Sequence, residues 1–169
     1  MNDALKQWNE AESEAALGAM LACCGARRWA SAMIARRPIA TAADLHDLAD
    51  HIWASMRERD WMEAFACHPR IGERSSSHSN SQSTIWSNQE QASIQTAADA
   101  TLAALAEGNA RYEEEFGFTY IICATSKSSD EMLAILNRRL AYDRETELQE
   151  AAEQQRHIMH VRLGKWLEE

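Results

Sequence analysis

His68 stands directly in front of Pro69, at the point where a helical stretch must end. A residue that precedes proline is pushed out of the α region toward extended backbone, so the imidazole leaves the helix end in a fixed direction. Imidazole titrates near neutrality, and a fixed placement suits it to act as a general acid or base. The alternative is a helix-terminal histidine that only bonds a nearby carbonyl, and local sequence alone favours this alternative.

The stretch SNQEQ, residues 87–91, also supports two interpretations. Serine followed three residues later by glutamate is a capping box, which predicts that a helix begins at Ser87 and that Glu90 bonds a backbone N–H. In the functional interpretation, the Glu90 carboxylate and the Gln91 amide line a pocket beside His68 and bind a ligand rich in N–H and C=O groups. Spacing alone favours the cap.

Two histidines near the C-terminal end, His157 and His160, lie one helical turn apart, a spacing that occurs in metal sites. Glu153 lies one turn earlier, but neither HExxH nor CxxC accompanies the pair. Solvent-facing or half-buried histidines are therefore favoured, and we expect no metal. Arg162 is by default a surface charge, and alternatively an inward arginine that binds an anion.

Helical patterns surround these candidates. Both prolines, Pro38 and Pro69, end a helical stretch. Apolar residues recur at three- and four-residue spacing in residues 17–24 and 45–56, which predicts one apolar stripe on each helix. Further helices are predicted over the Ala-rich residues 96–116, after the capping box that Ser128 forms with Glu131, and from about Asp143 to Trp166.

Two stretches break the helical pattern. Residues 71–86 are rich in Ser, Asn and Gln and lack periodicity, which predicts a long polar loop. Residues 117–125 hold β-branched and aromatic residues, but a lone strand would lack a partner, so we expect a short extended or irregular segment in the core. The sequence therefore predicts an all-α protein, a single-domain helical bundle over residues 1–169.

Composition excludes several classes of function. The formal net charge of -9 is spread along the chain without a basic run, so nucleic acid and anionic membranes are poor partners and a small molecule is favoured. The four cysteines include no CxxC pair and fit reduced thiols. With neither a signal peptide nor a membrane-spanning apolar run in the sequence, we expect a cytoplasmic protein.

Four separated motifs in order, HPRIG, SNQEQ, FGFTYIICATSKS and RL…VRL, resemble the 2-oxo-4-hydroxy-4-carboxy-5-ureidoimidazoline (OHCU) decarboxylase family. The resemblance covers nearly the whole chain. It implies an all-helical, cofactor-free and commonly homodimeric enzyme that converts OHCU to (S)-allantoin in urate degradation.

The resemblance also implies roles for individual residues. The catalytic histidine falls on His68 and the functional carboxylate on Glu90. The residues implied to bind substrate are Pro69, Ser87, Glu90, Gln91, Ile121, Ile122, Cys123, Ala124 and Arg162, with Tyr120 opening the main-chain segment.

Two residues depart from the family pattern. Ser126 stands where the family more usually has glycine, and Tyr142 where asparagine is more usual. Ser126 raises a question about the backbone of its turn, since glycine is the residue that tolerates positive φ.

Two other classes of function stay open at this point. A non-catalytic helical dimerisation or binding module would use the same apolar stripes and would treat His68 and Glu90 as structural residues. A metal-dependent hydrolase that uses His157 and His160 is the less favoured alternative.

Overall fold

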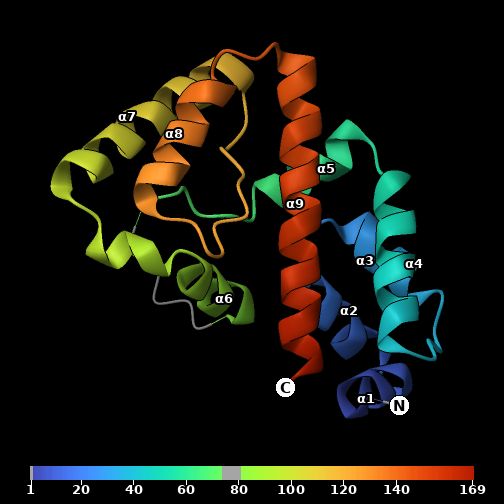
Figure 1. Ribbon diagram of the computed structural model, residues 1–169. Coiled ribbons are helices and arrows are strands. Elements are labelled where there is room, and N and C mark those ends of the chain that lie inside the picture. Colours follow the sequence, from blue (N-terminus) through green and yellow to red (C-terminus); the bar gives the residue numbers. More distant parts are fainter. Residues whose placement is uncertain (1, 74–80) are drawn as a thin grey trace. The chain divides into compact units, whose positions relative to one another are not determined.

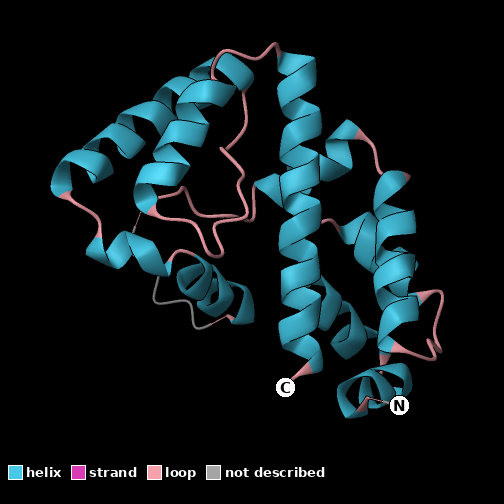
Figure 2. Ribbon diagram, in the orientation of Figure 1, coloured by secondary structure: helices cyan, strands magenta, loops and turns pink. Residues whose placement is uncertain are grey.

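The computed structural model describes residues 2–73 and 81–169, and every regular element within them is a helix (Figures 1 and 2). The α-helices are α1 (Asp3–Glu10), α2 (Ser13–Cys23), α3 (Arg27–Ile34), α4 (Ala42–Ala54), α5 (Glu58–Phe65), α6 (Gln82–Glu90), α7 (Asp99–Phe116), α8 (Ser129–Arg139) and α9 (Arg144–Leu167), with a short 3₁₀ helix at Ala92–Thr96. The predicted all-α class is confirmed. None of the described helices has the length and apolar character needed to cross a bilayer.

The chain groups into two compact units. The first comprises Met1–Ala64 and Gln155–Glu169, and the second comprises Phe65–Gln154. The long helix α9 therefore gives its first half to the second unit and its second half to the first. The single domain expected over residues 1–169 stays a prediction.

The first unit is built on α2, α3 and α4, which pack in sequence. Trp29 of α3 is fully buried and donates its indole N–H to the Ala49 carbonyl of α4 at 3.2 Å. Helix α4 begins at a capping box between Thr41 and Asp44. The predicted stripes are largely confirmed, because Met20 and Leu45 are fully buried and no residue of either stripe is exposed.

A half-buried polar cluster joins α4 to the second half of α9 within the first unit. The rings of His46 and His160 stack with 4.9 Å between centroids, and their Nδ1 atoms lie 2.6 Å apart. The other ring nitrogen of His160 lies 2.5 Å from an oxygen of Asp50, and Arg156 contacts both oxygens of that carboxylate at 3.1 Å. One proton is therefore shared between two facing imidazole nitrogens.

The second unit has a buried ion pair at its centre. The Arg139 guanidinium of α8 and the Glu147 carboxylate of α9 have no exposed side-chain surface. Arg139 also donates to the Ile121 carbonyl at 2.7 Å, and the Tyr112 hydroxyl of α7 donates to Glu147. The pair thus holds α7, α8, α9 and the segment before α8 in one network.

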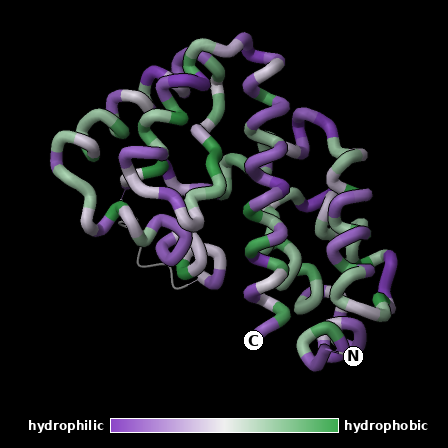
Figure 3. The backbone as a smooth tube through the Cα atoms, viewed as in Figure 1, coloured by the Kyte–Doolittle hydropathy of each residue, from purple (hydrophilic) through white to green (hydrophobic). Residues whose placement is uncertain are grey.

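Residues 117–125 pass through this network without helix or strand, as predicted (Figure 2). Side chains from Phe118 to Ala124 are buried except for the half-buried Thr119, and Figure 3 shows the hydrophobic character of this stretch. The segment ends in a turn where Ser126 has a φ of 65°, in the left-handed region that glycine tolerates best. The question that the sequence raised at Ser126 is answered by a positive φ.

The predicted loop over residues 71–86 is partly wrong. Residues 74–80 lie outside the described residues, but residues 82–86 belong to α6. The Ser81 hydroxyl caps this helix by accepting the Thr84 N–H at 3.3 Å, and Trp86 is buried with 2% of its surface exposed. Trp86 anchors this helix, but its neighbours in the sequence are mostly polar, so the segment shows no apolar periodicity.

Replacing Ser126 with glycine should stabilise the protein. A residue with a Cβ in the left-handed region costs about 1–2 kcal/mol, and the greater freedom of glycine in the unfolded chain offsets part of this gain. We expect Ser126→Gly to raise the free energy of unfolding by about 0.5–1 kcal/mol in urea titrations. Thr125→Gly is the matched control, since this neighbour has no positive φ and its replacement should destabilise. Equal destabilisation by both variants would contradict the prediction.

The histidine cluster should make stability depend on pH. Burial and the nearby His160 lower the pKa of His46, although Asp47 and Asp50 oppose this shift. The unfolded chain therefore binds the proton more readily, so this contribution to stability is complete above about pH 6.5 and is lost as the pH falls. We expect His46→Gln to flatten the dependence of the unfolding free energy between about pH 7.5 and 5.

The control for this measurement is His51→Gln, which removes an exposed histidine from the same helix. Urea titrations at each pH should show the wild-type slope in the control. A slope unchanged by His46→Gln would show that the cluster does not couple protonation to folding.

Candidate active site

A cavity of about 190 Å³ opens beside His68 in the second unit. Two segments line it, one directly after α5 and the other on α6. The lining residues are Cys67, His68, Pro69, Ser83, Thr84, Ser87 and Asn88. Such a volume lies below the ~300–1,000 Å³ typical of drug-sized ligands, so the cavity suits a small molecule.

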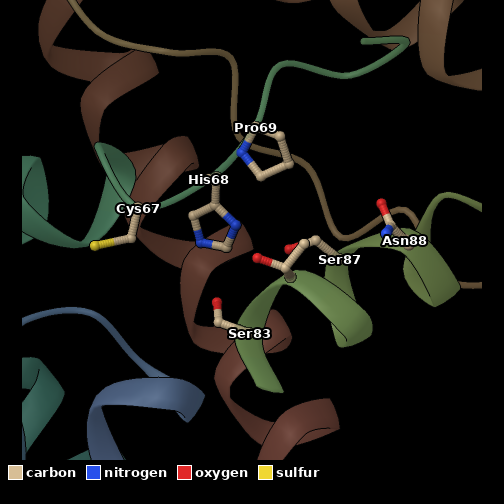
Figure 4. A pocket seen from close by; sticks show the side chains of 7 residues that line it. Cys67, His68, Pro69, Ser83, Ser87 and Asn88 are labelled. Atoms are coloured by element: carbon tan, nitrogen blue, oxygen red, sulfur yellow. The ribbon is translucent and has the colours of Figure 1, made fainter. Parts of the chain in front are cut away.

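His68 points into this cavity. Figure 4 shows its ring directed toward the face of α6 that presents Ser83 and Ser87, while the Cys67 sulfur points away. The backbone N–H of His68 donates to the Phe65 carbonyl at 3.1 Å, which closes the last turn of the preceding helix. This geometry agrees with the prediction that a histidine before a proline leaves the helix end in a fixed direction.

The capping-box interpretation of SNQEQ is wrong. Ser87 lies inside α6 with 4% of its surface exposed, and Glu90 is the last residue of that helix. The helix begins instead at Ser81, five positions before the buried Trp86. A capping box is a short local pattern that can occur by chance inside a helix. Here Ser81, which precedes the buried Trp86, takes the cap position instead of Ser87.

Helical spacing then explains which residues reach the cavity. Residues three and four apart share one side of a helix, so Ser83 and Ser87 present their hydroxyls together. Glu90, three residues after Ser87, ends α6, and Gln91 follows the helix. The structure therefore brings His68, Pro69 and Ser87 to one cavity, with Glu90 one turn further along α6.

Gln91 makes a contact that sequence reasoning missed. Its side-chain oxygen accepts the backbone N–H of Gly72 at 3.1 Å, and Gly72 has a φ of 89°. Gln91 thus fastens the chain that follows His68. Its predicted role in binding substrate stays a prediction.

The main-chain groups of the buried segment already have protein partners. Gln154 accepts the Cys123 N–H at 3.0 Å, and the Lys127 ammonium donates to the Cys123 carbonyl at 2.7 Å. The Ile121 carbonyl is bound by Arg139. The structure shows a fixed segment, and the predicted substrate contacts of Ile121, Ile122, Cys123 and Ala124 remain predictions.

Arg162 is an inward residue. It has 3% of its surface exposed, and its guanidinium donates to the Ala22 carbonyl at 3.3 Å. The default expectation of a surface charge is therefore wrong. Arg162 belongs to the first unit, and its predicted anion-binding role stays a prediction.

The histidines proposed for a metal site are engaged differently. His160 contacts His46 and Asp50, while His157 is exposed. Within residues 2–73 and 81–169, no group of three or more His, Cys, Asp or Glu side chains is placed to hold a metal ion. This arrangement does not favour a metal-dependent hydrolase.

Sequence reasoning missed Ser83, Thr84 and Asn88, because they fell in or next to a segment interpreted as a loop. The hydroxyl residues Ser83 and Ser87 are four apart, a spacing that would have pointed to one helix face had the helix start at Ser81 been recognised. The cavity combines an imidazole with hydroxyl and amide groups that donate and accept hydrogen bonds. It can bind a small polar molecule and move a proton on it.

Comparison with known proteins points to one family of enzymes. The family model for OHCU decarboxylase matches residues 9–164. The bifunctional uric acid degradation protein TTL of Arabidopsis thaliana is 34% identical over 144 residues, which are 85% of this chain and 44% of that protein. The 2-oxo-4-hydroxy-4-carboxy-5-ureidoimidazoline decarboxylase of Amia calva is 28% identical over 134 residues, covering 79% of this chain and 77% of that protein.

Two solved structures have a similar fold. The crystal structure of OHCU decarboxylase in the presence of (S)-allantoin aligns with a TM-score of 0.78 and 30% identity, over 94% of this chain and all of that one. The crystal structure of (S)-allantoin synthase aligns with a TM-score of 0.71 and 19% identity, over 96% of this chain and 53% of that one. The chain thus spans about half the length of two of these relatives. Because the family model covers nearly all of the sequence, this chain belongs to the OHCU decarboxylase family.

Proposed function

We propose that this chain decarboxylates OHCU to (S)-allantoin and carbon dioxide in urate degradation. The observation that supports this function most directly is the imidazole of His68 on a small polar cavity, in a chain whose family is defined by that reaction. The alternative of a non-catalytic module gives no reason for a histidine, two serines and an asparagine to surround one cavity.

The substrate itself explains why the reaction needs no cofactor. The carboxylate of OHCU is on the hydroxyl-bearing ring carbon, next to a ring C=N bond. When the bond to the carboxylate breaks, its electron pair forms a C=C bond to the ureido-bearing carbon, and the C=N electron pair moves to nitrogen. Cofactors of decarboxylases usually supply such an electron sink, which this substrate contains.

Proton transfer completes the reaction. The ring nitrogen that received the electron pair takes up a proton, and the resulting enol loses its hydroxyl proton while the ureido-bearing carbon gains a proton on one face. The products are neutral allantoin and carbon dioxide, with a net uptake of one proton. We assign this transfer to His68, because its ring faces the cavity and imidazole exchanges protons near neutral pH. Ser83 and Ser87 hydroxyls would orient ring oxygens and nitrogens from the opposite side.

The remaining assignments follow from the family resemblance. Glu90 would accept ureido N–H groups, and Arg162 would stabilise developing negative charge. An arginine that bound the starting carboxylate equally strongly would improve affinity without accelerating carbon dioxide loss. We also propose a cofactor-free homodimer in the cytoplasm, as the family resemblance implies.

Replacing the imidazole should remove most of the activity. We expect His68→Asn to lower kcat/KM by about 100-fold or more, since positioned acid-base groups contribute roughly 10²–10⁴-fold. OHCU is generated from urate in the cuvette, and its ultraviolet decay and the optical activity of the product are followed. His157→Gln is the control, because it removes an exposed histidine and should keep wild-type turnover with or without a chelator. Undiminished turnover by His68→Asn would refute the assignment.

Replacing the carboxylate at the end of α6 separates its two possible roles. Because the α6 cap is Ser81, Glu90→Gln should leave the melting temperature within a few degrees of wild type. The same variant should lower kcat/KM by about 10-fold, because it removes a charged hydrogen-bond acceptor. A lower melting temperature with unchanged kcat/KM would assign Glu90 to structure instead.

A further inference from the structure

The position of His68 depends on the chain that follows it. Beyond Pro69 the backbone runs through a turn in which Glu73 donates its N–H to the Arg70 carbonyl at 3.2 Å. No helix surrounds the imidazole, so contacts from other elements must hold this segment. Within the described part of the second unit, polar contacts from other helices reach this segment at Arg70, Ile71 and Gly72.

The first contact is exposed. The Arg70 guanidinium donates to both oxygens of Glu113 at 2.7 Å, but 48% of the Arg70 side chain remains accessible to solvent. Ion pairs of this kind add little to stability because water and salt screen them. The third contact is the hydrogen bond from Gly72 to Gln91, which is only partly buried.

The second contact is buried on both sides. The Asn109 side-chain amide of α7 donates to the Ile71 carbonyl at 2.7 Å, and the two residues have 2% and 5% of their surface exposed. A buried hydrogen bond is costly to leave unmade, because neither group has water as an alternative partner. Water can therefore replace this bond less easily than either of the other two polar contacts.

Only one of the two polar groups of the Asn109 side chain is paired within the part of the chain that the structure describes. Its side-chain oxygen is buried and has no hydrogen-bond partner among the described residues. An apolar side chain of the same size would remove that oxygen but would leave the buried Ile71 carbonyl unpaired instead. The amide is useful here for its N–H group, which fixes the direction of the Ile71 carbonyl three residues after His68.

Helix α7, which contains Asn109, packs closely against α8. A Cβ on the neighbouring Gly108 would lie 2.6 Å from a Leu136 methyl of α8, so α7 and α8 approach closely at this level (Figure 1). One turn before Asn109, Leu105 lies against Gly72, with 3.6 Å to a Cβ built there. The segment after His68 thus rests on α7 at Leu105 and is bonded to it at Asn109.

We propose that Asn109 is a positioning residue for His68, which it holds over the cavity through the Ile71 carbonyl. This inference rests on the proposed decarboxylase function, in which a misplacement of ~1 Å costs up to about 100-fold in rate. The buried amide, rather than the exposed pair of Arg70 with Glu113, sets the position of the imidazole.

The test variant is Asn109→Leu, which keeps the size of the side chain and removes the donor. One unpaired buried oxygen, on Asn109, is then replaced by another, on Ile71, so the melting temperature should stay within a few degrees of wild type. We expect kcat to fall by about 10- to 100-fold and KM to change by less than about threefold. A purely structural role would show the reverse, a lower melting temperature with kcat within about threefold of wild type, and would overturn the proposal.

Glu113→Gln, one turn further along α7, is the matched control and should keep kcat within about threefold of wild type. A loss as large as that of Asn109→Leu would assign the positioning to the exposed pair and overturn the proposal. Asn109→Ser provides a second variant if the leucine protein does not fold, because it leaves room for a water to reach the Ile71 carbonyl. It should lose kcat to a smaller extent, and wild-type kcat would also overturn the proposal.

A readout without substrate separates this proposal from the proposed function. Imidazole ¹H–¹⁵N spectra should show shifted or broadened His68 signals in Asn109→Leu, with unchanged signals from the exposed His51. If wild-type protein does not turn over OHCU but His68 signals respond, the positioning stands and the decarboxylase function fails. If turnover is normal in wild type and His68 signals are unchanged in the variant, the positioning fails and the function stands.

Discussion

The ion pair between Arg139 and Glu147 is the interaction on which the second unit depends. Both side chains are fully buried, so both have lost the hydration that stabilises them in water. An ion pair compensates for this loss only when further hydrogen bonds satisfy the remaining donors and acceptors. Here the Ile121 carbonyl accepts from Arg139 and the Tyr112 hydroxyl donates to Glu147. Burial raises the pKa of Tyr112 and of Tyr120, so both phenols remain protonated.

This network explains how an irregular segment can lie in a helical core. Residues without helix or strand leave backbone groups unpaired, and those groups are costly when buried. The Ile121 carbonyl is paired by Arg139, and the Cys123 peptide is paired on both sides by Gln154 and Lys127. Side chains from α8, from α9 and from Lys127 just before α8 replace the strand partner that the segment lacks.

The sequence predicts most of the helices because their apolar residues repeat with helical spacing, as in α4. At Ser126, where the resembled family more usually has glycine, the sequence only raises the question of the backbone angle, and the structure answers it with a positive φ. The start of α6 could not be predicted, since Ser81 and Ser87 are both plausible caps and only the burial of Trp86 decides between them.

In the candidate site too, some residues can be predicted from their neighbours in the sequence, and others only from the folded structure. His68 is predictable because proline restricts its backbone, whereas Ser83 joins it only once α6 is known to pass beside the loop. The contacts of Asn109 and Gln91 connect residues far apart in the chain, and nothing in their local sequence distinguishes them from surface amides.

A decarboxylation in which the substrate accepts the electrons leaves the protein with the tasks of orientation and proton transfer. Both tasks require fixed groups, and fixed groups require partners that solvent cannot replace. The second unit accordingly contains buried polar residues where an apolar core would be simpler: an arginine and a glutamate beside the irregular segment, and an asparagine with an unpaired oxygen behind the loop of His68. Water would compete for each of these contacts at the surface, so their burial keeps the irregular segment and the backbone after His68 in place.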